Sequence, residues 1–227
     1  MKAFTLSNKG YIEFTENLLK SIKYNNIDID LDICVLDDFS YRHFSKLEQN
    51  VIKHSDKNLK KFLKQDSKGF GEYMIFKIET IHNYLMEFDK VLYLDGDIVI
   101  KNNIIKYLDK ELENFELVIQ NDLNPKKPEI EYLCAGFMAI KSNHKTREFF
   151  NIKNISREQI LTGLHDQGYI NLNKNKLEYK ILPLDKFPNG AHYYNNSENL
   201  DPWIIHFNYV IGKKKKKIIK NFGEWYL

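Results

Sequence analysis

The sequence predicts a single α/β domain with a Rossmann-like fold, in which helices flank a mostly parallel central sheet. With 227 residues, 43% of them hydrophobic, the chain is long enough to bury the core of one domain. Short strand-like segments alternate with helix-like segments up to about residue 150. A strand, a helix and a second strand in succession favour parallel pairing, because the helix carries the chain back across the sheet.

The alternation is clearest before residue 100. Apolar residues at 2–6 predict an opening strand, and residues 11–24 carry apolar side chains at near-helical spacing. Residues 30–38 predict a second strand, which ends in two aspartates. A helix at 72–87 then precedes the apolar segment 91–94, whose composition is typical of a strand buried on both faces.

The remaining segments are interpreted from weaker patterns. Polar, lysine-rich residues 47–68 predict a solvated helix or loop, and the two prolines within 124–129 predict a loop. The other predicted elements are a helix at 103–113, strands at 116–122 and 132–141, helices at 143–152 and 156–175, a strand at 177–183 and a turn at 187–194.

Bulk properties exclude some classes of protein. A net charge of +3 is too small to indicate a general nucleic-acid binder. Cys34 and Cys134 lie in apolar segments, so we expect two buried, reduced thiols rather than a disulfide or a metal pair. No apolar run reaches the ~18 residues that a membrane span needs, and the first residues lack the apolar core of a signal peptide. We therefore expect a soluble, cytoplasmic protein.

Two aspartates form the central chemical motif. Asp95 and Asp97 directly follow the apolar strand at 91–94, and paired carboxylates at a buried strand end are costly unless a cation neutralises them. Mg²⁺ and Mn²⁺ prefer oxygen ligands and leave coordination positions for substrate phosphates. Ligands of α/β sheets bind at the carboxyl ends of strands, and Gly96 would let one approach closely. Alone, this motif could also be a surface turn.

Two features near the end of the chain fit the same chemistry. His206 follows the apolar residues 203–205 and could complete a metal site, although a lone histidine is more often structural. Gly212 comes six residues later and precedes the consecutive lysines Lys213–Lys217. A glycine followed by lysines could hold a diphosphate, whereas the simpler alternative is a solvated helix face.

Taken together, four motifs resemble known sugar transferases. Residues 88–102, 134–141, 165–171 and 203–216 occur in the order seen in the retaining, glycogenin-like glycosyltransferases of family 8. The last third of the chain resembles the related nucleotide-diphospho-sugar transferase family, which includes plant xylosyl- and arabinosyltransferases. This resemblance spans about residues 3–225. It implies a nucleotide-binding half at about 1–100 and a half at about 101–227 that handles the sugar and the acceptor.

The resemblance also implies roles for individual residues. Asp95, Asp97 and His206 would hold Mn²⁺ or Mg²⁺, and Asp166 with Gln167 would stand at the reaction centre. Either Asp37 or Asp38 would contact the base or ribose, and Lys213 or Lys216 would contact the diphosphate. The full set expected to bind the donor is Thr5, Leu6, Ser7, Asp37, Asp38, Lys77, Asp95, Gly96, Ala135, Gly136, Gly212, Lys213 and Lys216.

The implied reaction transfers a sugar from a nucleotide diphosphate, with UDP expected as the nucleotide, to the hydroxyl of an unidentified acceptor, with retention. Cys134 stands where family 8 has asparagine before the Ala-Gly pair, which puts the identity of the donor sugar in doubt. One alternative is a sugar-1-phosphate nucleotidyltransferase, but residues 5–14 lack the expected arginine and glycine-rich loop. The other is a non-catalytic nucleotide-sugar-binding module. The segment 121–131 is the expected acceptor edge.

Overall fold

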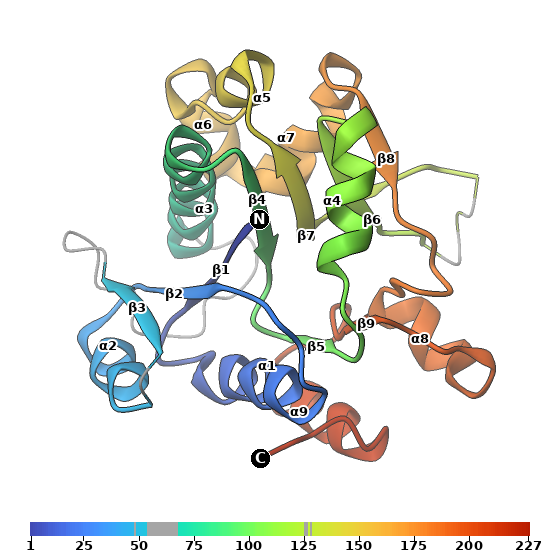
Figure 1. Ribbon diagram of the computed structural model, residues 1–227. Helices are drawn as coiled ribbons and strands as arrows, with labels where there is room; N and C mark the ends of the chain where they lie inside the picture. Colours follow the sequence, from blue (N-terminus) through green and yellow to red (C-terminus); the bar gives the residue numbers. More distant parts are fainter. Residues whose placement is uncertain (48, 54–67, 125–126, 128) are drawn as a thin grey trace.

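The computed structural model describes residues 1–47, 49–53, 68–124, 127 and 129–227 (Figure 1). The strands in this part of the chain are β1 (Lys2–Ser7), β2 (Leu31–Val35), β3 (Asn50–Lys53), β4 (Lys90–Leu94), β5 (Ile98–Ile100), β6 (Leu117–Asn121), β7 (Leu133–Lys141), β8 (Tyr179–Ile181) and β9 (Ile204–His206). Among the described residues, seven strands form one sheet in the order β3-β2-β1-β4-β7-β6-β8, and β5 pairs with β9 in a second.

The large sheet is mostly parallel, which confirms the predicted fold class. Strand β1 pairs in parallel with β2 and β4, β2 with β3, and β6 with β8. Strand β7 runs antiparallel to both of its neighbours, β4 and β6. The reason is connectivity: no helix lies between β6 and β7 among the residues that the structure describes, so the chain reverses direction and the two strands pair antiparallel.

Helices cover both faces of the large sheet (Figure 1). The α-helices in the described part of the chain are α1 (Ile12–Tyr24), α2 (Asp38–Ser45), α3 (Lys68–Glu87), α4 (Ile105–Asn114), α5 (His144–Phe149), α6 (Arg157–Gln159), α7 (His165–Asn173), α8 (Gly190–Asn196) and α9 (Gly212–Asn221), with a π-helical turn at Ile160–Leu164. Apolar residues of α3 and α7 pack on one face of the sheet, and those of α1 and α4 pack on the other. No helix in the described part of the chain has the length and hydropathy to cross a membrane.

Several local predictions differ from the structure. The turn predicted at 187–194 is wrong in its second half, where α8 begins at Gly190. The buried Asn189 side chain accepts a hydrogen bond from the backbone N–H of His192 at 2.8 Å, which satisfies an end group of this helix. The start of this helix could not be recognised from the sequence, because it contains the typical turn residues Pro188, Asn189 and Gly190.

The helix predicted at 156–175 is broken rather than continuous. The short helix α6 runs into the π-helical turn, and α7 then starts at His165, where φ is +55°. A non-glycine residue at positive φ is strained, and such residues concentrate at functional sites. Residues 54–67 of the predicted polar segment lie outside the described residues. The short elements α2, β3 and β5 had no periodicity long enough to predict them.

The helix cap at Asn189 yields a test of stability. Asn189→Ala should lower the free energy of unfolding by about 1–2 kcal/mol, because the cap of α8 is lost and the amide bonds to the Asn121 and Leu123 carbonyls disappear with it. Urea unfolding measures this change. The exposed Asn195→Ala, on the same helix, is the control and should stay within about 0.5 kcal/mol of wild type. Equal effects would contradict the capping role.

Candidate active site

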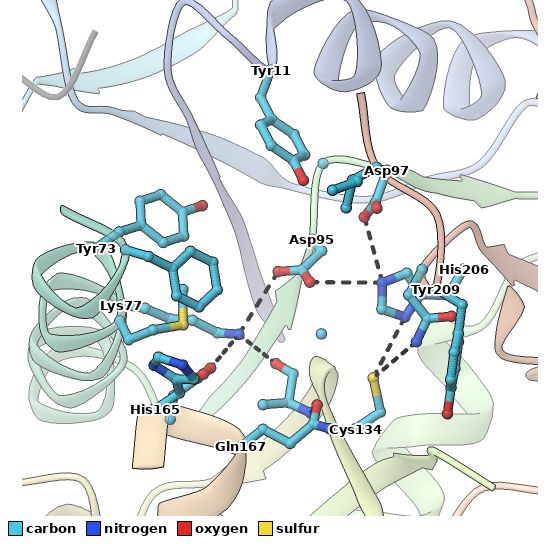
Figure 2. A pocket seen from close by; sticks show the side chains of 18 of the residues that line it. Tyr11, Tyr73, Lys77, Asp95, Asp97, Cys134, His165, Gln167, His206 and Tyr209 are labelled. Carbon is cyan, nitrogen blue, oxygen red and sulfur yellow. Dashed lines mark hydrogen bonds and ion pairs between the residues drawn. The ribbon is translucent and has the colours of Figure 1, made fainter. Parts of the chain in front are cut away.

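A cavity of about 710 Å³ opens at the carboxyl end of β4 (Figure 2). It is lined by residues from both halves of the chain, which meet where β4 gives way to β5. The lining residues with polar or aromatic side chains are Asn8, Tyr11, Phe70, Tyr73, Lys77, Asp95, Asp97, Tyr132, Cys134, His165, Asp166, Gln167, His206, Asn208, Tyr209 and Lys215.

Strand pairing brings His206 to the two aspartates. Residues 95–97 form the turn between β4 and β5, and β5 pairs antiparallel with β9 so that Ile98 lies opposite His206. The His206 Nε2 atom lies 3.6 Å from Asp95 Oδ2 and 3.4 Å from Asp97 Oδ1. The pairing of β5 with β9 therefore holds His206 beside the two carboxylates, although it lies more than 100 positions away from them in the sequence.

Glycine is required beside this cluster. A Cβ atom on Gly136 would lie 2.3 Å from His206 Cε1 and 2.6 Å from Asp95 Oδ2, so any larger residue would push these two side chains apart. A Cβ on Gly96 would lie 2.7 Å from the Thr15 hydroxyl. Both glycines thus allow close packing at this site, in addition to any contact with a ligand.

The cluster is compatible with a divalent cation. In the described part of the chain, Asp95, Asp97 and His206 each offer a ligand atom, and these atoms lie within 4.8 Å of one another. The His206 Nδ1 atom lies 2.7 Å from Gln120 Oε1, so the other ring nitrogen faces both carboxylates. Two carboxylates and an imidazole nitrogen aimed at one point need a proton or a metal ion between them. Oxygen and nitrogen ligands of this kind suit Mg²⁺ or Mn²⁺.

Lys215 neutralises one of the two carboxylates. Its ammonium, from the first turn of α9, forms a buried ion pair with Asp97 Oδ2. Burial would raise the pKa of Asp97, but Lys215 and His206 hold that pKa well below its ordinary value. Burial has the opposite effect on His206 and lowers its pKa. The neighbouring Cys134 and Asp97 more than offset this effect, so the pKa of His206 lies well above its ordinary value. Asp97 is therefore ionised.

Lys77 of α3 neutralises the other side of the cluster. The residue is only 3% exposed. Its ammonium lies 2.7 Å from Asp166 Oδ2 and 3.7 Å from Asp95 Oδ1, and it donates to the Ala135 carbonyl at 2.7 Å. Burial lowers the pKa of Lys77, but Asp166 and Asp95 raise it above the ordinary value. Figure 2 shows Lys77 and His206 on opposite sides of Asp95. Lys77 thus connects Asp95 to Asp166 of α7 and to Ala135 of β7.

A bulge between β6 and β7 exposes backbone groups at the site. The pairing shifts from Ile119 opposite Met138 to Gln120 opposite Cys134, so residues 135–137 bulge out of that ladder. The Ala135 N–H donates to Gln167 Oε1 at 3.1 Å, while the Ala135 carbonyl accepts from Lys77. Bulges of this kind re-aim groups beside active sites.

Gln167 is oriented at both ends of its amide. Its oxygen accepts from Ala135 and its nitrogen donates to Asp122 Oδ2 at 2.9 Å. Asp122 Oδ1 in turn accepts from the Asn208 amide at 3.1 Å. Asp122 and Asn208 had not been singled out from the sequence, since isolated polar residues in loops carry no periodic signal.

The structure places some expected donor residues away from the cavity. Thr5, Leu6 and Ser7 are buried in β1 beneath it. Asp37 caps α2, where its carboxylate accepts from the Ser40 N–H at 2.9 Å and from the Lys9 N–H at 2.7 Å. Asp38 pairs with Lys53 at 2.6 Å. Of the early residues, Asn8 and Tyr11 line the cavity instead.

The lysine run is a helix in which side chains are not equivalent. Lys213 is exposed and Lys216 pairs at 2.6 Å with Glu13, whereas the intervening Lys215 points into the cavity and is buried. A helix turns every 3.6 residues, so only part of a lysine run can face inward. Gly212, at the start of α9, has φ of +62°, a conformation that favours glycine.

Comparison with known families agrees with this geometry. The model of the nucleotide-diphospho-sugar transferase family matches residues 31–218. The chain belongs to this family. It is also similar to a UDP-galactose:fucoside alpha-3-galactosyltransferase of Dictyostelium discoideum, with 26% identity. That match covers the whole of this chain but only 43% of the Dictyostelium protein's length.

Solved structures of this family's fold resemble the protein throughout. The galactosyltransferase LgtC, in a complex with donor and acceptor sugar analogs, has a TM-score of 0.65 and 17% identity, and the match covers 99% of this chain and 96% of LgtC. Mouse xyloside xylosyltransferase 1 gives a TM-score of 0.60 with 15% identity, covering 93% of this chain and 99% of the mouse chain. At these identities the likeness shows a shared A-type glycosyltransferase fold.

The ion pair between Lys215 and Asp97 predicts an unusual effect on cation binding. Without nucleotide, Lys215→Met should bind Mn²⁺ about tenfold more tightly than wild type, because a positive charge that competes for Asp97 is removed. Calorimetric titration with Mn²⁺ measures this affinity. Lys216→Met, on the same helix but paired with Glu13, should leave it unchanged. Weaker binding in Lys215→Met would show that the two cations do not compete.

Proposed function

We propose that the protein transfers a sugar from a nucleotide diphosphate sugar, with UDP as the expected nucleotide, to an acceptor hydroxyl, and that it needs Mn²⁺ or Mg²⁺. The supporting observation is the convergence of Asp95, Asp97 and His206 beside Lys215 in one cavity of a chain that belongs to the nucleotide-diphospho-sugar transferase family. The cation, held by these three residues, would offset the charge that develops on the departing diphosphate.

The donor would occupy the upper part of the cavity as seen in Figure 2. Tyr11 and Tyr73 point into it and offer aromatic faces on which a base can stack. Lys215 lies between Asp97 and the Tyr11 ring, 5.7 Å from its centroid, and would turn its ammonium to the diphosphate. We therefore assign the phosphate contact that sequence motifs suggested for Lys213 or Lys216 to Lys215.

The sugar would lie over Ala135 and Gly136, next to Asp166 and Gln167. Lys77 neutralises Asp166, and both ends of the Gln167 amide are engaged, so these residues are better suited to hold the sugar than to attack it. In the proposed retaining reaction the bond from the anomeric carbon to the phosphate oxygen breaks. The acceptor oxygen bonds to that carbon from the same face, and its proton passes to the leaving phosphate.

The acceptor would approach from the side of Tyr132 and Tyr209. A second cavity of about 270 Å³ adjoins the first there, shares both tyrosines and is also lined by Asp122, Asn124, Lys127 and Ile130. Within the expected acceptor edge at 121–131, positions 125, 126 and 128 lie outside the described residues. Exposed tyrosine rings suit the apolar face of a sugar, so we propose a glycan or glycoside acceptor.

A screen of nucleotide sugars tests this function without a known acceptor. We expect one UDP-sugar to be hydrolysed slowly in the presence of Mn²⁺ and to be stable when a chelator is added. Release of free nucleotide diphosphate is the measurement. Metal-independent release from every donor, or release of pyrophosphate from a nucleoside triphosphate and a sugar phosphate, would contradict the proposal, and the second result would indicate nucleotidyl transfer.

Asp97→Asn should leave the protein folded and lower turnover by at least about two orders of magnitude, because an electrostatic stabiliser of the leaving group is lost. The measurement is the initial rate with the donor found in the screen, at saturating Mn²⁺. Asp109→Asn is the matched control, since Asp109 lies on α4 and pairs with Lys90 away from the cavity. If Asp97→Asn kept the wild-type rate, Asp97 would not be a catalytic metal ligand.

A further inference from the structure

Gln120 is a buried amide that none of the roles described above requires. It belongs to β6, is 0% exposed, and lies on the face of the strand that also carries Val118. Its side chain reaches the Nδ1 edge of the His206 ring, and it is the residue at which the pairing of β6 with β7 shifts. A polar amide in an apolar strand is costly to bury unless all its hydrogen bonds are made.

The partners of Gln120 determine which end of its amide faces the histidine. Its nitrogen lies 3.1 Å from the Phe187 carbonyl oxygen and 3.0 Å from that of Pro188. Carbonyl oxygens only accept hydrogen bonds, so the NH₂ group has to face them. The amide oxygen is then directed at His206 Nδ1, at 2.7 Å.

This orientation in turn determines the proton on the histidine ring. An amide oxygen only accepts, so His206 Nδ1 has to carry a hydrogen and donate it to Gln120. The thiol of Cys134, 3.6 Å from the same nitrogen, cannot donate to it as well. Nε2, which faces Asp95 and Asp97, is therefore the nitrogen that would give up its proton to bind a cation.

We propose that Gln120 is a positioning residue that holds His206 in the Nδ1-protonated form, with Nε2 directed at the cation site. The proposal rests on the proposed function only for its metal. The backbone carbonyls of residues 187 and 188 contribute to this positioning, because they accept from the Gln120 NH₂ group and so fix the orientation of its amide. Partners of this kind typically change metal affinity by about 10- to 100-fold when they are removed.

The test compares two replacements of Gln120 with a control. Gln120→Met has a similar shape but offers no oxygen to Nδ1, and it should weaken Mn²⁺ binding by about 10- to 100-fold. Gln120→Glu keeps an acceptor oxygen and should bind Mn²⁺ more tightly than Gln120→Met does. Asn17→Leu removes another buried amide, which bonds to residues 224 and 226 away from the cavity, and should leave Mn²⁺ binding unchanged.

Nitrogen-15 NMR of labelled histidine provides a readout that a merely structural role would not move. In wild type, with or without diamagnetic Mg²⁺, His206 should show a slowly exchanging Nδ1–H, which Gln120→Met should lose and Gln120→Glu should keep. Absence of this signal in wild type, or its persistence together with wild-type Mn²⁺ affinity in Gln120→Met, would overturn the proposal. If wild type binds no Mn²⁺ at all, the metal part of the proposed function fails, and the NMR signal still decides the role of Gln120.

Discussion

Negative charge concentrated at the carboxyl end of β4 is the constraint on which the site depends. Asp97 is buried and the Asp95 side chain beside it is 33% exposed, and crowding two carboxylates with little access to water is costly unless positive groups accompany them. Those groups come from three separate elements: Lys77 from α3, His206 from β9 and Lys215 from α9. The cluster therefore links the middle of the chain to its last helix.

The positive groups are anchored to very different degrees. Lys77 has two carboxylates and a carbonyl as partners, and His206 is held by the β5–β9 ladder and by Gln120. Lys215 is tied to the cluster through Asp97 and stands beside the aromatic ring of Tyr11. A cation that took the place of this ammonium at Asp97 would release it for a phosphate. In the proposed function, this arrangement would couple cation binding to recognition of the donor.

The irregular parts of the backbone lie where the reacting groups meet. The bulge in β7 turns the N–H and carbonyl of Ala135 toward Gln167 and Lys77, and the π-helical turn before α7 ends at the positive-φ residue His165. Regular strands and helices pair all their backbone groups internally, whereas a bulge frees some of them for side chains. In this protein, the freed N–H of Ala135 holds Gln167, and its carbonyl holds Lys77, which pairs with Asp166.

The sequence by itself determined the fold class, the family resemblance and the grouping of Asp95, Asp97 and His206. The composition of the strands and the order of the motifs can both be read from the linear sequence, without knowing how the chain folds. Tertiary structure decided which lysine meets Asp97, because the phase of α9 selects Lys215 and turns Lys216 toward Glu13. It also placed the Asp37 carboxylate against the Lys9 N–H, and brought the Gln120 amide to His206 Nδ1. These outcomes depend on which side chains face one another across elements distant in sequence, and packing and charge neutralisation settle that only when the chain is folded.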